Sequence, residues 1–264
     1  MTAAQFRVSP AALTDARVGD LVVVEGPEAH HALRVRRVVP GEVVRLADGA
    51  GAGVRGLVEG TDGGALAVRV DAVLRDADPG PTLVLVQALA KGGRDELAIE
   101  AATELGVDEV VAWSAERSVV RWRADREAKS LEKWQRVVEA AAKQARRLSD
   151  PRVVGPWTTS RLAERMRATV AGGGSAYILD GQAQEPLAGR RPPASGEVLI
   201  VVGPEGGVSD LELATFVACG GTPVRLGAPV LRSSTAGPAA LAVICAATRW
   251  RACPEAEDVV PQSP

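Results

Sequence analysis

The chain of 264 residues carries 31 basic and 33 acidic side chains, and 46% of its residues are hydrophobic. This length suffices for one sizeable core or for two smaller ones. A membrane-spanning helix needs about 20 consecutive apolar residues, and the densest apolar stretch, residues 239–247, is about half of that. Residues 1–10 lack the apolar run of an export signal, so we expect a cytoplasmic protein with no membrane partner.

Histidine and cysteine are scarce, which limits metal chemistry and nucleophilic catalysis. The histidines His30 and His31 are adjacent, and neighbouring side chains on a strand would point to opposite faces. The sequence therefore does not favour a histidine metal centre or a Ser-His-Asp triad. Cys219, Cys245 and Cys253 show no CxxC spacing, so we expect neither a disulfide framework nor a metal site, and inert buried thiols instead.

The first part of the chain, from Phe6 to about residue 73, has short β-like runs separated by Gly, Pro and Asp. These runs lie at residues 21–24, 42–46, 56–58 and 65–70. The pattern is typical of a small β-barrel or β-sandwich. The polar residues 75–81 carry two prolines and predict a linker. We therefore expect domains at residues 1–74 and 82–252, followed by a flexible tail at residues 253–264.

After the linker, apolar runs alternate with helical spacing, beginning with residues 83–89, 95–105 and 107–113. Such alternation indicates βαβ units, an α/β class and a mostly parallel sheet. The same reading predicts further helices at residues 127–148, 162–170, 211–218 and 235–250, and further strands at residues 177–179, 198–202 and 223–226.

The sequence Gly203-Pro-Glu-Gly-Gly207 follows a buried strand and precedes a helix that Ser209 or Asp210 would cap. Ligands bind at the carboxyl ends of strands in open α/β sheets, and glycines let the backbone approach them closely. The segment is neither a Walker loop nor a GxGxxG dinucleotide loop. A tight turn without a ligand explains the glycines equally well.

A second loop follows the strand at residues 223–226 and carries hydroxyls at Ser233, Ser234 and Thr235 and a single cation, Arg232. It predicts a pocket wall at which Arg232 meets an anion. The alternative is that Ser234 and Thr235 only cap the last helix. Residues 236–247 are apolar nearly all round, which predicts a helix buried either in the core or against another subunit.

Basic charge gathers between Arg117 and Arg152, where 11 basic and five acidic residues occur. This concentration indicates a polyanion partner, although a solvated helix face with pairs such as Glu139 and Lys143 is the alternative. A second basic cluster lies at residues 30–37, and Lys91-Gly-Gly-Arg94 follows a strand as another candidate site edge. Because the chain has only five Trp, one Tyr and two Phe, phosphate contacts would dominate RNA affinity.

Taken in order, these segments resemble the RsmE family, the 16S rRNA uridine-N3 methyltransferases of the SPOUT (trefoil-knot) superfamily. The resemblance runs from residue 6 to about residue 250. The matching stretches are Leu33-Arg-Val-Arg36, Pro40-Gly-Glu-Val-Val-Arg-Leu-Ala-Asp-Gly49, Lys91-Gly-Gly-Arg94, Ala102-Thr-Glu-Leu-Gly106, Ser114-Ala-Glu-Arg-Ser118, Lys133-Trp-Gln135, Gly203-Pro-Glu-Gly-Gly207 and Leu226-Gly-Ala-Pro-Val-Leu-Arg-Ser-Ser-Thr-Ala236.

The resemblance implies a PUA-like β-barrel for RNA, followed by an α/β domain that is knotted where it binds S-adenosylmethionine. It implies a homodimer formed through the knotted domain and 16S rRNA of the small ribosomal subunit as the substrate. The implied cofactor contacts are Leu179, Gly203, Pro204, Glu205, Gly206, Gly207, Leu226, Gly227, Leu231, Ser233 and Thr235. Together with the basic clusters, it assigns RNA contacts to Arg7, Arg34, Arg36, Lys91, Arg94, Arg117 and Arg147.

The sequence departs from the family at two places. Leu231-Arg-Ser-Ser-Thr235 stands where the family often reads Leu-Arg-Thr-Glu-Thr, so the role of that Glu does not pass to Ser234. Lys143-Gln-Ala-Arg-Arg147 matches Glu-Gln-Ser/Cys-Gly-Arg in part, and register aligns Arg147 with the family's Arg.

Methylation at uracil N3 requires loss of the N3 proton and stabilisation of the developing imidate. We expect Arg232 to stabilise that anion as the catalytic residue and Arg94 to position the RNA, and we assign no general base. Because N3 lies on the Watson–Crick edge, the target base must be unpaired or flipped out.

Two other functions remain open at this point. One is a non-catalytic RNA-binding protein of ribosome assembly, and the other is a knotted enzyme that modifies another rRNA position, such as a ribose 2′-OH. A nucleotide hydrolase is disfavoured because no triphosphate cradle or acidic metal cluster is visible.

Overall fold

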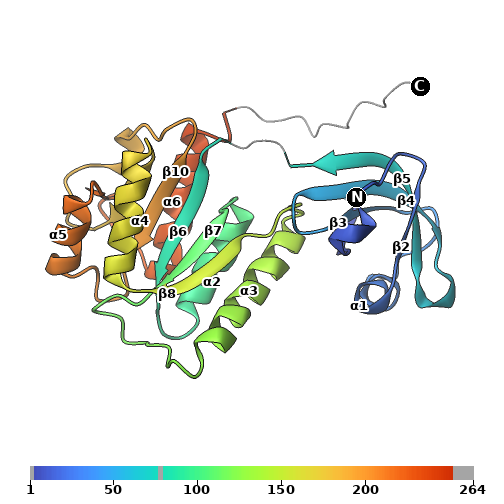
Figure 1. The fold of residues 1–264 in the computed structure, drawn as a ribbon, viewed down its shortest axis with the longest axis horizontal. Coiled ribbons are helices and arrows are strands. Elements are labelled where there is room, and N and C mark those ends of the chain that lie inside the picture. Colours follow the sequence, from blue (N-terminus) through green and yellow to red (C-terminus); the bar gives the residue numbers. More distant parts are fainter. Residues whose placement is uncertain (1–2, 77–79, 252–264) are drawn as a thin grey trace. The chain divides into compact units, whose positions relative to one another are not determined.

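The computed structural model describes residues 3–76 and 80–251, which divide into two compact units (Figure 1). The first unit holds the N-terminal segment to residue 76 together with residues 142–150. The second holds residues 80–141 and 151–251. Three residues of the expected linker, residues 77–79, lie outside the described residues, as do Cys253 and the expected tail.

The first unit is built on a five-stranded sheet in the order β1-β3-β4-β5-β2. β1 pairs with β3 in parallel, and the other pairs are antiparallel. Alternate side chains such as Phe6, Leu46 and Val54 point into one core, and two register shifts in β4 help the sheet to curl. The predicted β-rich domain is thus confirmed as a curled half-barrel sheet. Its strands are β1 (Ala4–Arg7), β2 (Leu21–Val24), β3 (Val43–Ala47), β4 (Ala52–Gly60) and β5 (Leu66–Arg75), with 3-10 turns η1 (Pro10–Ala12) and η3 (Asp62–Gly64).

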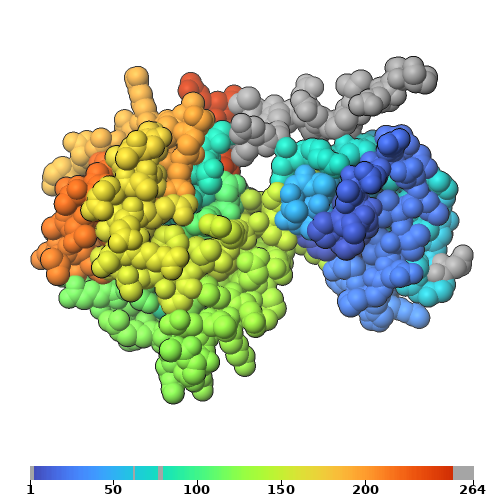
Figure 2. All heavy atoms as spheres, in the orientation of Figure 1, coloured from blue at the N-terminus to red at the C-terminus, as the bar shows by residue number. Residues whose placement is uncertain are grey.

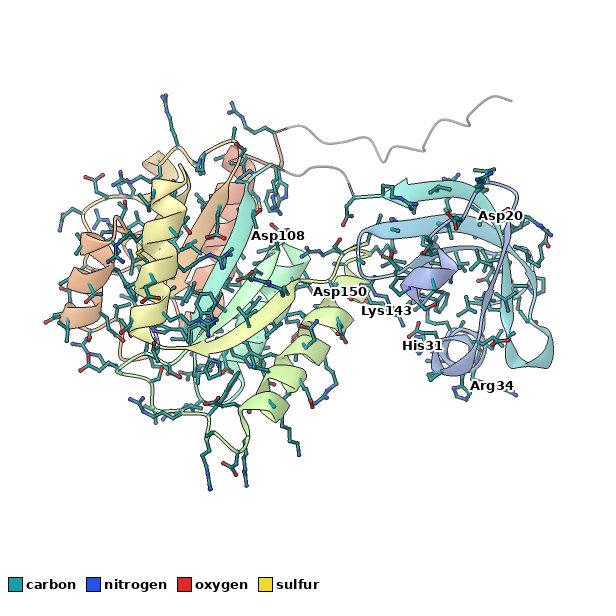
Figure 3. All side chains as sticks on the ribbon, in the orientation of Figure 1. Asp20, His31, Arg34, Asp108, Lys143 and Asp150 are labelled. Carbon is teal, nitrogen blue, oxygen red and sulfur yellow. The ribbon has the colours of Figure 1, made fainter. Side chains whose placement is uncertain are left out.

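The two histidines lie on a helical segment, not on a strand as the sequence analysis assumed. Helix α1 (Gly26–His30) continues directly into a π-helical turn, η2 (His31–Val35). Figure 3 labels His31 and Arg34 on this segment. The ring of His31 packs edge-on against Phe6, with centroids 6.3 Å apart, so His31 has a structural contact in the core of this unit.

Residues 142–150 pack against the first unit, although they are distant from it in sequence. The carbonyl oxygen of Arg147 accepts hydrogen bonds from Gln5 Nε2 at 2.8 Å and from the guanidinium of Arg7 at 3.3 Å. Arg7 also forms an ion pair with Asp150. Lys143 lies 2.7 Å from a carboxylate oxygen of Glu28. These contacts explain why the segment belongs to the first unit.

The helix expected at residues 127–148 is α3 (Glu127–Gln144), four residues shorter. Arg146, just beyond its end, has a φ of 58°. This is the left-handed region, which glycine adopts far more readily than other residues. The family sequence that this segment resembles, Glu-Gln-Ser/Cys-Gly-Arg, has Gly directly before its Arg. The backbone at Arg146 therefore supports the alignment of Arg147 with the family's Arg.

The second unit contains a six-stranded, all-parallel sheet in the order β11-β9-β10-β6-β7-β8. The predicted α/β class and parallel sheet are confirmed. The edge strand β8 was not predicted, because Gly155 and Pro156 interrupt its apolar pattern, and edge strands tolerate such residues. The strands are β6 (Thr82–Ala88), β7 (Glu109–Trp113), β8 (Arg152–Trp157), β9 (Ser175–Leu179), β10 (Glu197–Val202) and β11 (Thr222–Val224).

Helices cover both faces of this sheet. α4 (Thr159–Ala171) and α5 (Asp210–Ala218) pack on one face, where Figure 2 shows the yellow side chains of α4. α2 (Arg94–Glu104), α3 and α6 (Ser233–Ala247) pack on the other, with the 3-10 turn η4 (Leu187–Gly189) beside α6. None of the described helices has both the length and the apolarity needed to cross a membrane.

The last helix, α6, lies in the core of the second unit. Leu241 and Cys245 are fully buried, and Ile244 is nearly so. A Cβ atom added at Gly237 would lie 2.9 Å from Leu85 Cδ1, so glycine allows α6 to approach β6 closely. The core interpretation of this apolar helix is confirmed, and the subunit-interface interpretation stays a prediction.

Candidate functional site

The loop after β10 is a tight turn that depends on its glycines. The N–H of Gly207, whose φ is 72°, donates to the carbonyl oxygen of Pro204 at 2.8 Å. A Cβ atom at Gly203 would lie 3.0 Å from the backbone nitrogen of Val208. Ser209 then caps α5 through a capping box with Glu212. The tight-turn interpretation is confirmed, and it is compatible with a ligand at the same loop.

The loop after β11 leads into α6 without a side-chain cap. The N-cap residue is Arg232, so Ser234 and Thr235 lie inside the helix and the expectation that they cap it is wrong. Ser233, the first helical residue, is only 8% exposed, and its Oγ has no hydrogen-bond partner among the described residues. A buried hydroxyl without a partner is unfavourable unless a ligand or water completes it.

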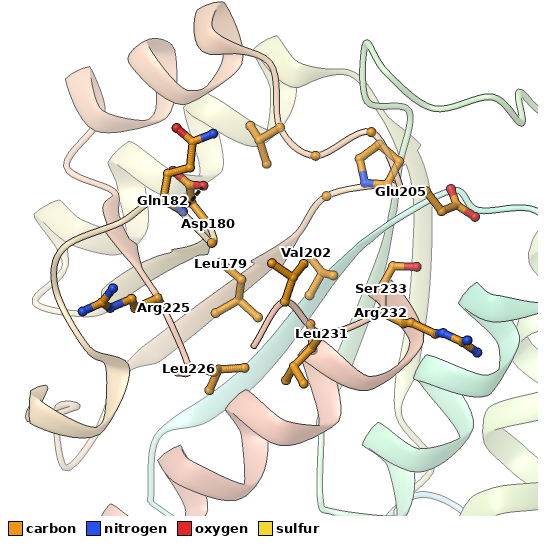
Figure 4. A pocket seen from close by; sticks show the side chains of 18 of the residues that line it. Leu179, Asp180, Gln182, Val202, Glu205, Arg225, Leu226, Leu231, Arg232 and Ser233 are labelled. Atoms are coloured by element: carbon orange, nitrogen blue, oxygen red, sulfur yellow. Dashed lines mark hydrogen bonds between the residues drawn. The ribbon is translucent and has the colours of Figure 1, made fainter. Parts of the chain in front are cut away.

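These two loops enclose a cavity of about 460 Å³ at the carboxyl ends of β9, β10 and β11 (Figure 4). Its size suits a small-molecule ligand. The expected cofactor residues line it with one exception, Thr235, which is exposed on α6 and outside the lining. The lining residues that were expected are Leu179, Gly203, Pro204, Glu205, Gly206, Gly207, Leu226, Gly227, Leu231 and Ser233.

Besides Asp210, which it considered only as a helix cap, the sequence analysis missed three polar residues of this cavity: Asp180, Gln182 and Arg225. In Figure 4 they lie on one side of the cavity, and Glu205 and Arg232 lie on the other. Asp180 accepts a hydrogen bond from the backbone N–H of Gln182 at 3.0 Å. These residues directly follow β9 and β11, so the rule that ligands bind at strand carboxyl ends could have found them.

Three expected functional cations also line the cavity: Arg94, Arg117 and Arg232. The guanidinium of Arg94 lies 3.2 Å from the carboxylate of Glu205. Arg117 donates to the carbonyl oxygens of Gly206 at 3.3 Å and Val208 at 3.2 Å, so it holds the loop after β10. Arg232 is exposed, and within residues 3–76 and 80–251 its guanidinium has no hydrogen-bond or ion-pair partner.

A partly buried hydrogen-bond network holds Glu116, the residue directly before Arg117. Ser209 Oγ donates to the carboxylate of Glu116 at 2.5 Å, and the N–H of Glu116 donates to Glu212 at 2.8 Å. Thr159 Oγ donates to the same Glu212 oxygen at 2.9 Å. The segment after β7 is thereby fastened to the start of α5, which supports the position of Arg117.

The remaining cations expected to bind RNA lie elsewhere. Lys91 lines a second cavity of the same unit. Arg34 and Arg36 are exposed in the first unit. Arg7 and Arg147 of that unit are engaged in the contacts of residues 142–150, and the side chain of Arg7 is 18% exposed. An RNA contact by any of these residues stays a prediction.

Two carboxyl groups of the second unit have shifted pKa values. Burial raises the pKa of Asp95, even though backbone N–H groups of Ala90 and Glu96 donate to it. Burial also acts to raise the pKa of Glu197, but hydrogen bonds from Arg165 and Thr169 outweigh it and lower that pKa. In the part of the chain that the structure describes, no three His, Cys, Asp or Glu side chains gather as metal ligands.

Two family models match the chain. One, described as an RNA methyltransferase domain, covers residues 78–245, and the other, described as an RNA methyltransferase PUA domain, covers residues 24–71. Among curated proteins, the chain is 42% identical to the ribosomal RNA small subunit methyltransferase E of Mycobacterium bovis, over 89% of the chain and 90% of that protein. It is 28% identical to the Bacillus subtilis protein of the same name, over 84% of the chain and 88% of that protein.

Solved structures agree with this result. The chain superposes with a TM-score of 0.77 on the ribosomal RNA small subunit methyltransferase E of Neisseria gonorrhoeae bound to S-adenosyl methionine, at 26% identity over 93% of the chain and 98% of that structure. A Legionella pneumophila methyltransferase in complex with the same cofactor gives a TM-score of 0.75 at 26% identity, over 94% of the chain and 99% of that structure.

Proposed function

The chain belongs to the ribosomal RNA small subunit methyltransferase E family, and on this premise we propose that it transfers a methyl group from S-adenosylmethionine to small-subunit rRNA. We propose N3 of one uridine of 16S rRNA as the acceptor. The observation that carries the proposal is the cavity of about 460 Å³ between the loops after β10 and β11, with Arg94 and Arg232 among its lining residues.

The residues of this cavity fit the cofactor. Ser233 offers a buried Oγ without a partner, which is the kind of atom that a bound ligand completes. Leu179 and Leu226 offer apolar surface, and Asp180 and Glu205 offer carboxylates to a cationic ligand. When bound, the cofactor supplies an electrophilic methyl group, and these residues bind and orient it.

Arg232 is the proposed catalytic residue. Its guanidinium is exposed and has no partner among the described residues, so it is available to a uracil oxygen. As the N3 proton leaves, negative charge develops on that oxygen, and a cation placed there lowers the barrier. Arg94 is the proposed positioning residue for the RNA, and alignment of base and methyl group supplies a further part of the rate.

The assembly and the domain bounds are also proposals. We propose a homodimer formed through the second unit. We also propose an RNA-binding domain at residues 1–74, joined by residues 75–81 to a methyltransferase domain at residues 82–252, of which residues 142–150 pack in the first unit. The knot in that domain and a cytoplasmic location follow from the family resemblance and the proposed substrate. Analytical ultracentrifugation of the whole chain tests the dimer, and a monomer at micromolar concentration would contradict it.

The deciding experiment is methyl transfer from labelled S-adenosylmethionine to small ribosomal subunits from cells that lack this protein. Mass spectrometry then identifies the modified nucleoside. We expect 3-methyluridine at one position of 16S rRNA. A different methylated nucleoside would support S-adenosylmethionine as the methyl donor and contradict uridine N3 as the acceptor. No transfer by a folded chain would favour a non-catalytic RNA-binding protein.

A further inference from the structure

A second cavity, of about 310 Å³, lies in the second unit. The glycine loop at residues 91–93 forms one side of it, and Trp122 and Trp134 form another. The two cavities share no lining residue. Arg94 lines the first cavity, whereas the residues directly before and after it line the second. The beginning of α2 therefore separates two adjacent cavities.

Two tryptophan rings pack against each other at the aromatic side of the second cavity. Trp122 and Trp134 meet edge to face, with centroids 5.2 Å apart and an interplanar angle of 85°. Trp134 is 2% exposed and belongs to the core, whereas Trp122 is partly exposed. The buried ring thus holds the outer ring in place, and Trp122 offers a ligand apolar surface at a small cost in side-chain entropy.

The charged side chains that line the cavity are Lys91, Lys133, Asp95 and Glu96, and their charges sum to zero. Glu96 and Lys133 form an ion pair. The carboxylate of Asp95 accepts backbone hydrogen bonds from Ala90 at 3.3 Å and Glu96 at 3.0 Å, so its oxygens already have partners. Lys91 is exposed, and within the described ranges it has no ion-pair partner. The ammonium group of Lys91 is therefore available to an anion at this cavity.

We propose that the second cavity binds a nucleotide adjacent to the one that is methylated, with its base against Trp122 and its phosphate at Lys91. The inference rests on the proposed function, because it requires that an RNA strand brings the nucleotide to be methylated to Arg94 and Arg232, which line the neighbouring first cavity. The strand would pass over the start of α2, where Arg94 lies between the two nucleotides.

A nucleotide matches the cavity better than a purely apolar or a purely anionic ligand. Its base is flat and aromatic, and stacking on a tryptophan side chain contributes to binding whatever the base. Its phosphate is an anion, for which Lys91 acts as a point charge. Ser130, which also lines the cavity, offers a hydroxyl to the edge of the base.

The test compares Trp122→Ala and Lys91→Gln with the wild-type chain. The assays are KM for unmethylated small ribosomal subunits, Kd for S-adenosylmethionine by calorimetry, and direct binding of unmethylated 16S rRNA by filter retention. We expect Trp122→Ala to raise KM and the RNA Kd about tenfold. Lys91→Gln should raise both severalfold and reduce their salt dependence. Neither variant should change the cofactor Kd, and Trp122→Phe should restore much of the RNA binding.

Trp250→Ala is the matched control. Trp250 is 52% exposed and lies beyond the C-terminal end of α6, whereas the N-terminal end of that helix lines the first cavity. This variant should leave all three constants unchanged. Methyl transfer with wild-type KM and RNA Kd in both Trp122→Ala and Lys91→Gln would overturn the second-cavity proposal and leave the proposed function intact. If Trp122→Ala weakens RNA binding but the wild-type chain transfers no methyl group, the proposed function would be overturned and RNA binding at the second cavity would stand. Because Lys91 is exposed, its variant tests the proposal even if Trp122→Ala fails to fold.

Discussion

Arg94, the first residue of α2, forms an ion pair with Glu205 in the loop after β10, with a guanidinium nitrogen 3.2 Å from a carboxylate oxygen. The pair joins two segments that follow neighbouring strands, β6 and β10. The sequence analysis assigned Arg94 to RNA and Glu205 to the cofactor. In the structure each is the partner of the other, so a ligand that binds one of these two side chains would compete with the ion pair.

Replacement of Arg94 by Ala should weaken RNA binding far more than it weakens the fold. Both members of the pair are partly exposed, at 40% and 24%, and such pairs contribute less than about 1 kcal/mol to stability. We expect KM for small ribosomal subunits to rise about tenfold and the melting temperature to stay nearly constant. Arg123→Ala, which removes an exposed cation paired with Asp125, is the control. Equal increases in KM for the two variants would show that Arg94 contributes only non-specific electrostatic attraction to RNA, and no specific contact.

Arg232→Ala should abolish turnover and preserve cofactor affinity. Removal of one group that stabilises developing charge costs about a hundredfold to a thousandfold in kcat. The variant should be assayed by single-turnover methyl transfer, with calorimetry for S-adenosylmethionine in parallel. Loss of cofactor binding together with turnover would contradict the catalytic role, because Arg232 would then contribute to binding the cofactor and not to stabilising the reacting base.

Arg117→Ala should give the opposite pattern. Because Arg117 donates to the carbonyl oxygens of Gly206 and Val208, its removal frees the loop after β10. We expect the Kd for S-adenosylmethionine to rise about fivefold to tenfold, the effect of losing about one net hydrogen bond. Calorimetry measures this directly, with Arg232→Ala as the comparison. An unchanged cofactor Kd with impaired RNA binding would make Arg117 an RNA contact instead.

Arg146→Gly should stabilise the first unit. At a φ of 58°, a residue with a Cβ atom pays about 1 kcal/mol that glycine avoids. Burial lowers the pKa of Arg45, and repulsion from the charge of Arg146 lowers it further. Urea unfolding of Arg146→Gly and Arg146→Ala separates the two effects, because both remove the charge and only glycine relieves the backbone. Identical midpoints for the two variants would contradict the strain argument.

A fall in pH should lower the stability of the second unit as Glu197 becomes protonated. Its pKa lies below the ordinary value of 4.5, because hydrogen bonds from Arg165 and Thr169 outweigh burial. Glu197 therefore contributes stability that is fully present above about pH 4.5 and is lost as the pH falls through the lowered pKa. Glu197→Gln should lower the melting temperature at pH 7, and the difference from wild type should shrink in acid. Glu185→Gln, at a carboxylate that is 64% exposed, should show no such trend.

Much of the second unit could be predicted because its strands are continuous apolar runs followed by glycine-rich loops. Residues 198–202 and the loop after them are the clearest case: a buried strand, a turn that needs glycine, and a capped helix follow one another in sequence. Strand β8 was missed because Gly155 and Pro156 break the pattern, and only its edge position makes them acceptable.

Other features were missed by the sequence analysis or depend on contacts that no local pattern encodes. Ser234 and Thr235 look like caps, but α6 begins one residue earlier, at Ser233. His31 lies in a π-helical turn that continues α1, whose start is marked by Pro27 and Glu28, a helix signal that the sequence analysis did not use. Two of the carboxylates that line the cavity, Asp180 and Glu205, are brought to one site by the order of β9 and β10 in the sheet. The knot that the family resemblance implies stays a prediction.

The assignment of residues 142–150 to the first unit makes the two units inseparable by a single cut of the chain. A fragment that ends after residue 76 would lack Arg147 and Asp150, the partners of Gln5 and Arg7. Buried polar atoms on that sheet would then lose their hydrogen bonds, which costs more than the bonds themselves contribute. Truncated versions are therefore a poor way to study the N-terminal half, and its contribution is better isolated by point substitutions in the whole chain.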